Sequence, residues 1–278
     1  MTSHRANLRL ARTKEKVVPD PLLNRMGLQV ARTAAARANQ RLLRPTVGEL
    51  AARHQQAFRR DGIVVIEDFV PATDFDELRR HALNLLDSPG MPIRHIEMGG
   101  NQLDSLRIDD LDEDDRAGLG PLLDDPRLWE LVSMAGRRDV TSTAAVITID
   151  RLRQLGGAAD PESELHSDTF FSTVKCWLYL NDVVDAAGPL EFVPQSHRLS
   201  PRQLGGVYRH SLDPTARPSR RIPSVELESR GLSPRRFTCG ANTFVIADTF
   251  GYHRRAPGTV GATREAIHVQ VRANPFRR

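Results

Sequence analysis

The run VKCWLYLNDVVDAAGPLEFVPQSHR, residues 174–198, carries the strand pattern and the turn signal that decide the fold of this chain. Side chains of a strand alternate between its two faces, so Lys175, Trp177 and Tyr179 are expected to share one face. The residues between them are Cys and Leu, an apolar set suited to packing on the other face. A Gly-Pro turn then leads into LEFV, which predicts a second short strand.

Runs of similar character surround this stretch from Thr141 onward, among them TAAVITIDRLR, NTFVIAD and REAIHVQVR, with Gly, Pro and Asp turns between them. The acidic segment 88–120 is expected to be a solvated loop. Several short strands that follow N-terminal helices predict a mostly antiparallel sandwich or barrel with helices outside it. The helices are expected over about residues 21–44, 47–60, 72–86 and 121–137, and an early strand over residues 63–69.

The formal net charge of +4 hides an uneven distribution along the 278 residues. Residues 1–60 carry a net charge of +10, residues 61–196 a net charge of −16, and residues 197–238 a net charge of +6. The chain therefore combines an acidic body with a basic N-terminal arm and a basic insertion. Because an acidic body repels a phosphate backbone, this pattern disfavours a nucleic acid partner despite the positive total.

Two further features narrow the class of protein. No apolar run approaches the roughly 20 residues that span a bilayer, and the first residues lack the apolar stretch of a signal peptide. The two cysteines, Cys176 and Cys239, are too few for a disulfide framework or a four-thiolate zinc site. These features predict a cytoplasmic protein.

The sharpest chemical signal is the run His166-Ser167-Asp168. Two residues apart on an extended chain, an imidazole and a carboxylate lie on one face and can bind the same ion. A third ligand is available in His253, which follows the strand-like run NTFVIAD. Two histidines and one carboxylate, with coordination positions left open, suit a non-haem Fe(II) oxygenase. The other pair of this spacing, His95-Ile96-Glu97, lacks such a context.

Residues 141–273 resemble the phytanoyl-CoA dioxygenase family of Fe(II)/2-oxoglutarate oxygenases. The resemblance rests on the His-Ser-Asp motif, on the run 174–198, and on Gly-Tyr-His253 followed eleven residues later by Arg264. It extends weakly upstream to about residue 50, where a helix–strand–helix pattern similar to that of the family begins.

The resemblance implies a double-stranded β-helix core, a jelly roll of the cupin-like kind, with flanking helices. It implies that His166, Asp168 and His253 hold Fe(II) as the catalytic centre, and that Arg264 pairs with the distal carboxylate of 2-oxoglutarate. A guanidinium is a permanently charged, bidentate partner for such a carboxylate. The implied reaction uses O2, converts 2-oxoglutarate to succinate and CO2, and hydroxylates an unactivated C–H bond of a substrate.

Lys175 and Trp177 are assigned to the cofactor site because they share a face just after the metal motif. A buried, unpaired ammonium is costly, so an anionic partner should lie near Lys175. A carboxylate of 2-oxoglutarate or of substrate is one alternative, and an internal salt bridge or exposure at the end of the strand is the other. Trp177 matches a tryptophan common in the family, where packing is the alternative role.

Three further residues are candidates for substrate contacts. Counting by two from Arg264 places His268 and Gln270 on its face, where they would line the pocket, although a satisfied core histidine is the alternative for His268. Arg255 stands where the family commonly has a small hydroxyl residue, two positions after the distal histidine.

The expected organisation is a basic N-terminal arm or helix over residues 1–45 and a dioxygenase domain over residues 46–278. The domain has its β-helix core at about residues 141–273 and a lid-like insertion at about residues 198–238. The arm packs on the body, packs on a second subunit, or makes a peripheral contact with an anionic membrane.

The insertion bears on the substrate because it is rich in arginine. If several of its arginines face the site, they favour a small anionic substrate, either a secondary metabolite or an acidic sugar of the cell envelope. A solvated loop is the alternative. Two other classes of function remain open: a catalytically inactive β-helix binding protein, and a nucleic-acid-binding protein that uses the basic arm.

Overall fold

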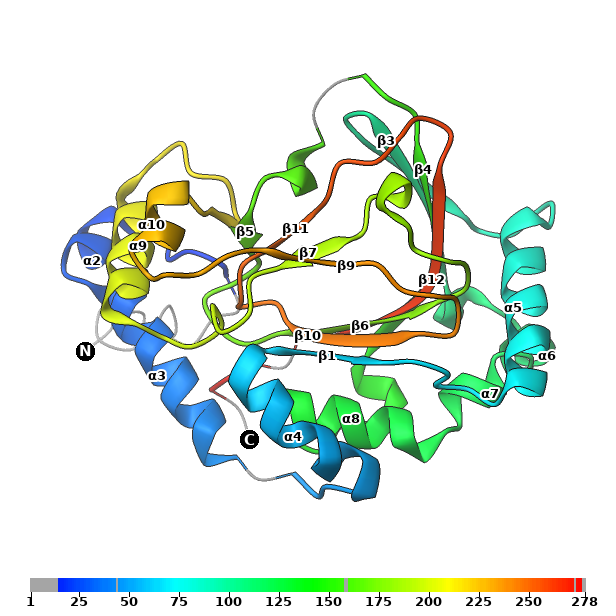
Figure 1. Cartoon of the computed structure of the whole chain (residues 1–278). Helices are drawn as coiled ribbons and strands as arrows, with labels where there is room; N and C mark the ends of the chain where they lie inside the picture. The colour runs from blue at the N-terminus through cyan, green and yellow to red at the C-terminus, as the bar shows by residue number, and fades with distance from the viewer. Residues whose placement is uncertain (1–14, 44, 158–159, 273, 277–278) are drawn as a thin grey trace.

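The computed structural model describes residues 15–43, 45–157, 160–272 and 274–276, and two antiparallel sheets form its centre (Figure 1). The larger sheet has the strand order β1 (Ile63–Ile66), β10 (Phe244–Asp248), β6 (Val174–Tyr179), β12 (Thr263–Val271), β4 (Val146–Gln154), β3 (Asn101–Arg107) and β2 (Arg94–Met98). The smaller sheet has the order β8 (Arg220–Arg221), β5 (His166–Ser167), β11 (His253–Arg255), β7 (Leu190–Phe192) and β9 (Arg235–Phe237). The predicted class, mostly β with flanking helices, is confirmed.

Helices cover the outer face of the larger sheet, and the main apolar core lies between them. The strand alternation predicted for β6 is confirmed, because Val174, Cys176 and Leu178 pack in this core while Lys175 and Trp177 face a cavity between the sheets. Fully burying one such aliphatic side chain contributes about 1.5–3 kcal/mol. The covering helices are α4 (Glu49–Asp61), α5 (Ala72–Asp87) and α8 (Pro126–Gly136), with the short helices α6 (Glu113–Ala117) and α7 (Gly120–Leu123) near α5 (Figure 1).

The predicted helix over residues 21–44 is two helices, α2 (Pro21–Arg25) and α3 (Leu28–Leu42). Gly27 between them has a φ of +87°, a left-handed conformation that interrupts a helix and that glycine adopts without strain. The described part of the arm packs on the body: Arg32 and Arg37 of α3 are 2% and 8% exposed. Residues 1–14 of the predicted arm lie outside the described residues.

The solvated loop expected over residues 88–120 is wrong in part, because β2 and β3 form a hairpin there that extends the larger sheet beside β4. Both strands are rich in polar residues, so they lack the apolar alternation by which a strand is found in a sequence. The strand with which β3 pairs, β4, is remote along the chain. One-turn helical segments occur at Ile108–Asp110, Ser142–Ala144, Pro161–Ser163 and Asp185–Ala187.

The insertion at residues 198–238 is ordered and belongs to the fold. It contains α9 (Pro201–Leu212) and α10 (Ser224–Glu228), and it supplies β8 and β9 to the smaller sheet. Helix α9 lies against α2 and α3 (Figure 1). The Asn24 side chain donates a 3.0 Å hydrogen bond to the Ser211 carbonyl there. None of the helices in the described part of the chain is both long and apolar enough to cross a membrane.

Candidate active site

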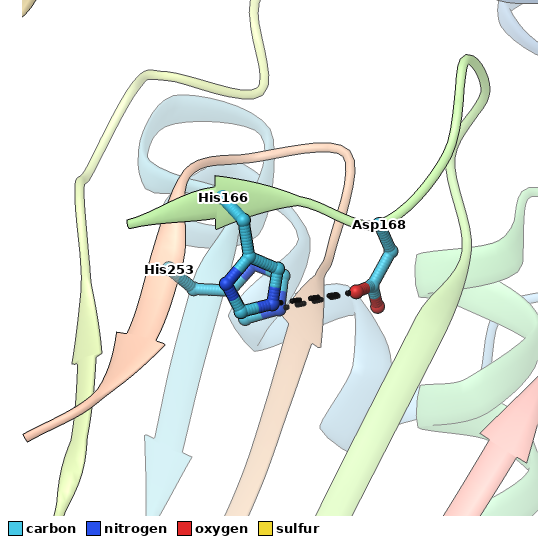
Figure 2. Close-up of side chains that lie close together, drawn as sticks. All are labelled: His166, Asp168 and His253. Atoms are coloured by element: carbon cyan, nitrogen blue, oxygen red, sulfur yellow. Dashed lines mark ion pairs between the residues drawn. The ribbon is translucent and has the colours of Figure 1, made fainter. Parts of the chain in front are cut away.

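Three candidate metal ligands meet at the smaller sheet (Figure 2). His166 on β5 and His253 on β11 are direct partners in the antiparallel register, so their rings lie side by side with centroids 4.5 Å apart. Asp168 follows β5, and its Oδ1 is 3.6 Å from Nε2 of each histidine. All three residues are buried, and their ligand atoms lie within 4.8 Å of one another.

Backbone carbonyls orient both imidazoles. Nδ1 of His166 is 2.7 Å from the Glu164 carbonyl, and Nδ1 of His253 is 2.9 Å from the Gly251 carbonyl. Since a carbonyl can only accept, each Nδ1 carries the proton and each Nε2 turns a lone pair toward Asp168. Burial lowers the pKa of His253 to about 4, which keeps that ring neutral and able to bind a metal.

The donor set fits a metal ion. Two nitrogen lone pairs and a carboxylate oxygen face one another, and the buried Nε2 of His166 makes no hydrogen bond in the described part of the chain. A second carboxylate, that of Glu162, lies 3.1 Å from the same Nε2. A cation relieves the mutual repulsion of these acceptors.

Lys175 on β6 has an internal partner. Its Nζ lies 2.8 Å from Oδ2 of Asp168. Burial by itself raises the pKa of Asp168, but the Lys175 ammonium holds that pKa well below its usual range. The carboxylate is therefore ionised, with one oxygen held by Lys175 and the other turned toward the histidines.

A cavity of about 340 Å³ opens between the two sheets at this point. Arg264, Ala266, His268 and Gln270 of β12 line it, as their two-residue spacing predicts, while Ile267 and Val269 between them pack in the apolar core. The other side chains that line the cavity and bear on its chemistry are Arg94 of β2, Ser105 of β3, Thr148 and Asp150 of β4, Glu162, Lys175, Trp177, Arg254 and Arg255.

Arg264 lies half-buried in this cavity, and its Nη1 donates to the Gly188 carbonyl. Burial lowers the pKa of its guanidinium. None of the carboxylates in the described residues forms an ion pair with it. A buried guanidinium that lacks an anionic partner is suited to bind a carboxylate that enters with a ligand.

Arg255, in contrast, is already neutralised. Its Nη1 lies 2.5 Å from Oδ2 of Asp160, which also accepts a 2.9 Å hydrogen bond from the Asn101 side chain. Arg255 therefore forms part of the cavity wall with its charge paired.

The arginines of the insertion do not line this cavity in the described structure, so the condition under which they would favour an anionic substrate is not met. Several of them form ion pairs with acidic residues instead. Arg220 pairs with Glu226 at 2.8 Å and donates to the Tyr252 hydroxyl, next to His253, at 3.1 Å. Arg236 pairs with Glu191 of β7 at 2.8 Å. Acids distant from Arg236 in the sequence take up its charge, which the composition of the insertion could not reveal.

Several residues of the cavity were not found by sequence reasoning. Asp150 and Thr148 share one face of β4, so counting by two along TAAVITIDRLR would have found them. Arg94 and Ser105 had no signal of this kind, because the hairpin that carries them was not predicted.

Two imidazoles and a carboxylate on one side of a cavity between antiparallel sheets, with an unpaired guanidinium in the same cavity, define a non-haem iron, 2-oxoglutarate-dependent oxygenase. Residues 58–228 match the model of the family described as Phytanoyl-CoA dioxygenase (PhyH). The chain belongs to this family, and its cofactors are Fe(II) and 2-oxoglutarate, with O2 as the oxidant.

Solved structures with the same fold are distant in sequence. The epimerase SnoN, in complex with Fe3+, alpha ketoglutarate and nogalamycin RO, has a TM-score of 0.58 and 17% identity, over 79% of this chain and 82% of that one. EctD from S. alaskensis with bound Fe has a TM-score of 0.51 and 17% identity, over 82% of each chain. AviO1 from Streptomyces viridochromogenes Tue57 has a TM-score of 0.50 and 15% identity, over 81% of this chain and 96% of that one. These likenesses confirm the predicted jelly-roll core. The search of curated proteins finds no match.

Proposed function

We propose that His166, Asp168 and His253 hold the iron and that Arg264 binds the distal carboxylate of 2-oxoglutarate. The observation that carries this proposal is the convergence of two Nε2 lone pairs and one carboxylate oxygen, 3.6 Å apart, at the wall of the cavity that Arg264 also lines. Bound iron, with 2-oxoglutarate and O2, supplies the oxidising power that hydroxylates an unactivated C–H bond. The balance is one substrate C–H, one 2-oxoglutarate and one O2 converted to C–OH, succinate and CO2.

Lys175 and Trp177 complete the cofactor side of the site in this proposal. Because Lys175 holds Oδ2 of Asp168, Oδ1 stays directed at the metal position between the histidines. The Lys175 ammonium also adds positive potential beside 2-oxoglutarate, a dianion. Trp177 lies two residues further along β6 and forms the wall beside it.

Anaerobic reconstitution with Fe(II) and 2-oxoglutarate tests the cofactor assignment. The wild-type protein is expected to develop a metal-to-ligand charge-transfer band. In Arg264→Ala the 2-oxoglutarate concentration for half-maximal absorbance should rise by about 10- to 100-fold, the loss expected for a charge-assisted hydrogen-bonded pair. Arg79→Ala, at an exposed position of α5, is the matched control and should titrate like the wild type. A wild-type protein that binds neither iron nor 2-oxoglutarate would refute the proposal.

The proposed substrate is a small anionic molecule, either a secondary metabolite or an acidic sugar of the cell envelope. The support comes from Arg94, at the rim of the cavity. Arg254 and Arg255 line the same cavity but are paired with Glu191 and Asp160, whereas Arg94 has no ion-pair partner among the described residues. An unpaired guanidinium at the rim attracts an anion. SnoN, whose structure contains nogalamycin RO, lends support to the secondary-metabolite class.

The substitution Arg94→Met tests the anionic class. With the reconstituted enzyme, D-glucuronate, D-galacturonate and D-gluconate should raise succinate formation more than neutral D-glucose does. Arg94→Met is expected to raise the KM for the acid by about tenfold, because an ionic hydrogen bond at an exposed site is lost. Arg79→Met serves as the control. Equal KM values in Arg94→Met and Arg79→Met would contradict the role of Arg94, and intact cofactor binding without any turnover would favour the binding-protein alternative.

We further propose that one cytoplasmic catalytic domain extends over residues 46–278, with the arm docked on it. The thiols of Cys176 and Cys239 are free, which suits a reducing compartment. Arg32 and Arg37 are buried against the body. These two cations of the described part of the arm therefore do not face an anionic membrane.

A further inference from the structure

The ring of His268 is held from two sides inside the cavity. On one side it stacks on Trp177, its direct partner on the neighbouring strand, with centroids 5.4 Å apart and planes 12° apart. On the other side its Nδ1 lies 3.6 Å from Oδ2 of Asp150. Oδ1 of Asp150 accepts a 2.6 Å hydrogen bond from the Ser105 hydroxyl. A side chain held in this way has little freedom to rotate.

One atom of this ring has no partner. Nε2 of His268 is buried, belongs to a cavity-lining side chain, and makes no hydrogen bond to any described residue. Burial lowers the pKa of His268 to about 4, so the ring is neutral. With the proton on Nδ1, facing the Asp150 carboxylate, Nε2 keeps a lone pair without a partner beside the cavity. Buried acceptors are rarely left unpaired, which points to a donor that arrives with a ligand.

The surroundings select the kind of donor. Burial disfavours a positive charge at His268, and this outweighs the attraction of the Asp150 and Asp168 carboxylates. An ammonium group on the ligand would lose its hydration in the same buried place, whereas a neutral hydroxyl loses much less. Arg94, Ser105 and Asp150 are successive register partners across β2, β3 and β4, so a polar row leads from the unpaired cation at the rim toward His268.

We propose that His268 is the substrate-binding residue that accepts a hydrogen bond from a substrate hydroxyl, and that Asp150 and Ser105 are positioning residues that hold its ring. This inference rests on the proposed function and deepens it. The substrate class is a hydroxylated acid, with its anionic group toward Arg94 and a hydroxyl on His268, so that a C–H bond is directed at the metal position.

The experiment compares His268→Phe with His268→Gln in the reconstituted enzyme. Phenylalanine keeps a ring to stack on Trp177 but removes the acceptor, whereas glutamine keeps an acceptor oxygen. The probes are D-glucuronate, D-galacturonate and D-gluconate, with adipate as an acid without hydroxyls. At least one hydroxylated acid should raise succinate formation above background, and adipate should not. His268→Phe should raise the KM for that acid by about 10- to 100-fold, the effect of losing one hydrogen bond in a buried site.

Two controls separate binding from folding. His95 is also a histidine beside an aspartate on the larger sheet, 2.7 Å from Asp104, but it is exposed and does not line the cavity. His95→Phe should keep the wild-type KM. The 2-oxoglutarate titration of the charge-transfer band should agree within twofold in every variant, and His268→Gln should recover part of the lost affinity.

Several outcomes would overturn the inference. One is that none of the three hydroxylated acids raises succinate formation above background, although the wild type binds iron and 2-oxoglutarate. Another is the same KM in His268→Phe and His95→Phe. If His268→Phe does not fold, the variant Asp150→Asn replaces it in the test. Asp150→Asn is expected to raise the KM for the acid while 2-oxoglutarate binding stays intact. An unchanged KM in Asp150→Asn would refute the inference. Failure of the wild type to bind iron or 2-oxoglutarate would instead refute the proposed function.

Discussion

Replacing Asp168 by alanine is expected to abolish iron binding and succinate formation together. Asp168 is the carboxylate whose Oδ1 faces both imidazoles at 3.6 Å, and removing it leaves two neutral nitrogens to hold a dication. Loss of a residue that merely orients a metal ligand costs about 10- to 100-fold in affinity, so loss of the ligand itself should exceed a hundredfold. Anaerobic Fe(II) titration, followed by the charge-transfer band with 2-oxoglutarate, measures the effect.

The control for this prediction is the other His-x-acid pair of the sequence. Glu97→Ala, on the exposed strand β2, should bind iron and turn over like the wild type. Because Asp168 also holds the Lys175 ammonium, the double variant Asp168→Ala/Lys175→Met leaves no buried ammonium unpaired. It should fold, as circular dichroism can establish, and still fail to bind iron. Wild-type iron affinity in Asp168→Ala would contradict the ligand assignment.

The second large effect is expected in stability, from Arg37→Ala in α3. Arg37 pairs with Asp248 of β10 at 3.1 Å, and the two side chains are 9% and 5% exposed. Its other guanidinium nitrogen donates a 2.8 Å hydrogen bond to the His197 carbonyl. Removing one partner of a buried pair leaves an uncompensated charge and costs about 3–5 kcal/mol. Urea denaturation should report a loss of this size in the free energy of unfolding.

Arg25→Ala provides the comparison, since Arg25 is an exposed arginine of α2 and its loss should change stability by less than about 0.5 kcal/mol. Adding Asp248→Asn to Arg37→Ala removes the unpaired charge but keeps an oxygen for the hydrogen bond from the Phe250 amide. The double variant should therefore regain part of the stability. If Arg37→Ala and Arg25→Ala unfold at the same urea concentration, the buried pair of Arg37 and Asp248 contributes nothing to stability.

Prediction from the sequence worked best where one strand contains the whole signal. The alternation along β6 and β12 identified which residues face the cavity, including Lys175, Trp177, Arg264 and His268. It failed for the hairpin of β2 and β3, whose polar residues do not alternate with apolar ones. Because the hairpin was not predicted, Arg94 and Ser105 were not among the candidate site residues, although both belong to the polar row between the rim and His268.

The sequence by itself determined the class of fold, the family and the faces of the strands, because a strand has a side-chain period of two whatever it packs against. Only the tertiary structure decided which charges are free. Ion pairing depends on distances between residues remote along the chain, such as Arg255 with Asp160 and Arg37 with Asp248. A count of arginines therefore pointed to the insertion, whereas the unpaired cation at the rim of the cavity is Arg94, on a strand that the sequence did not reveal.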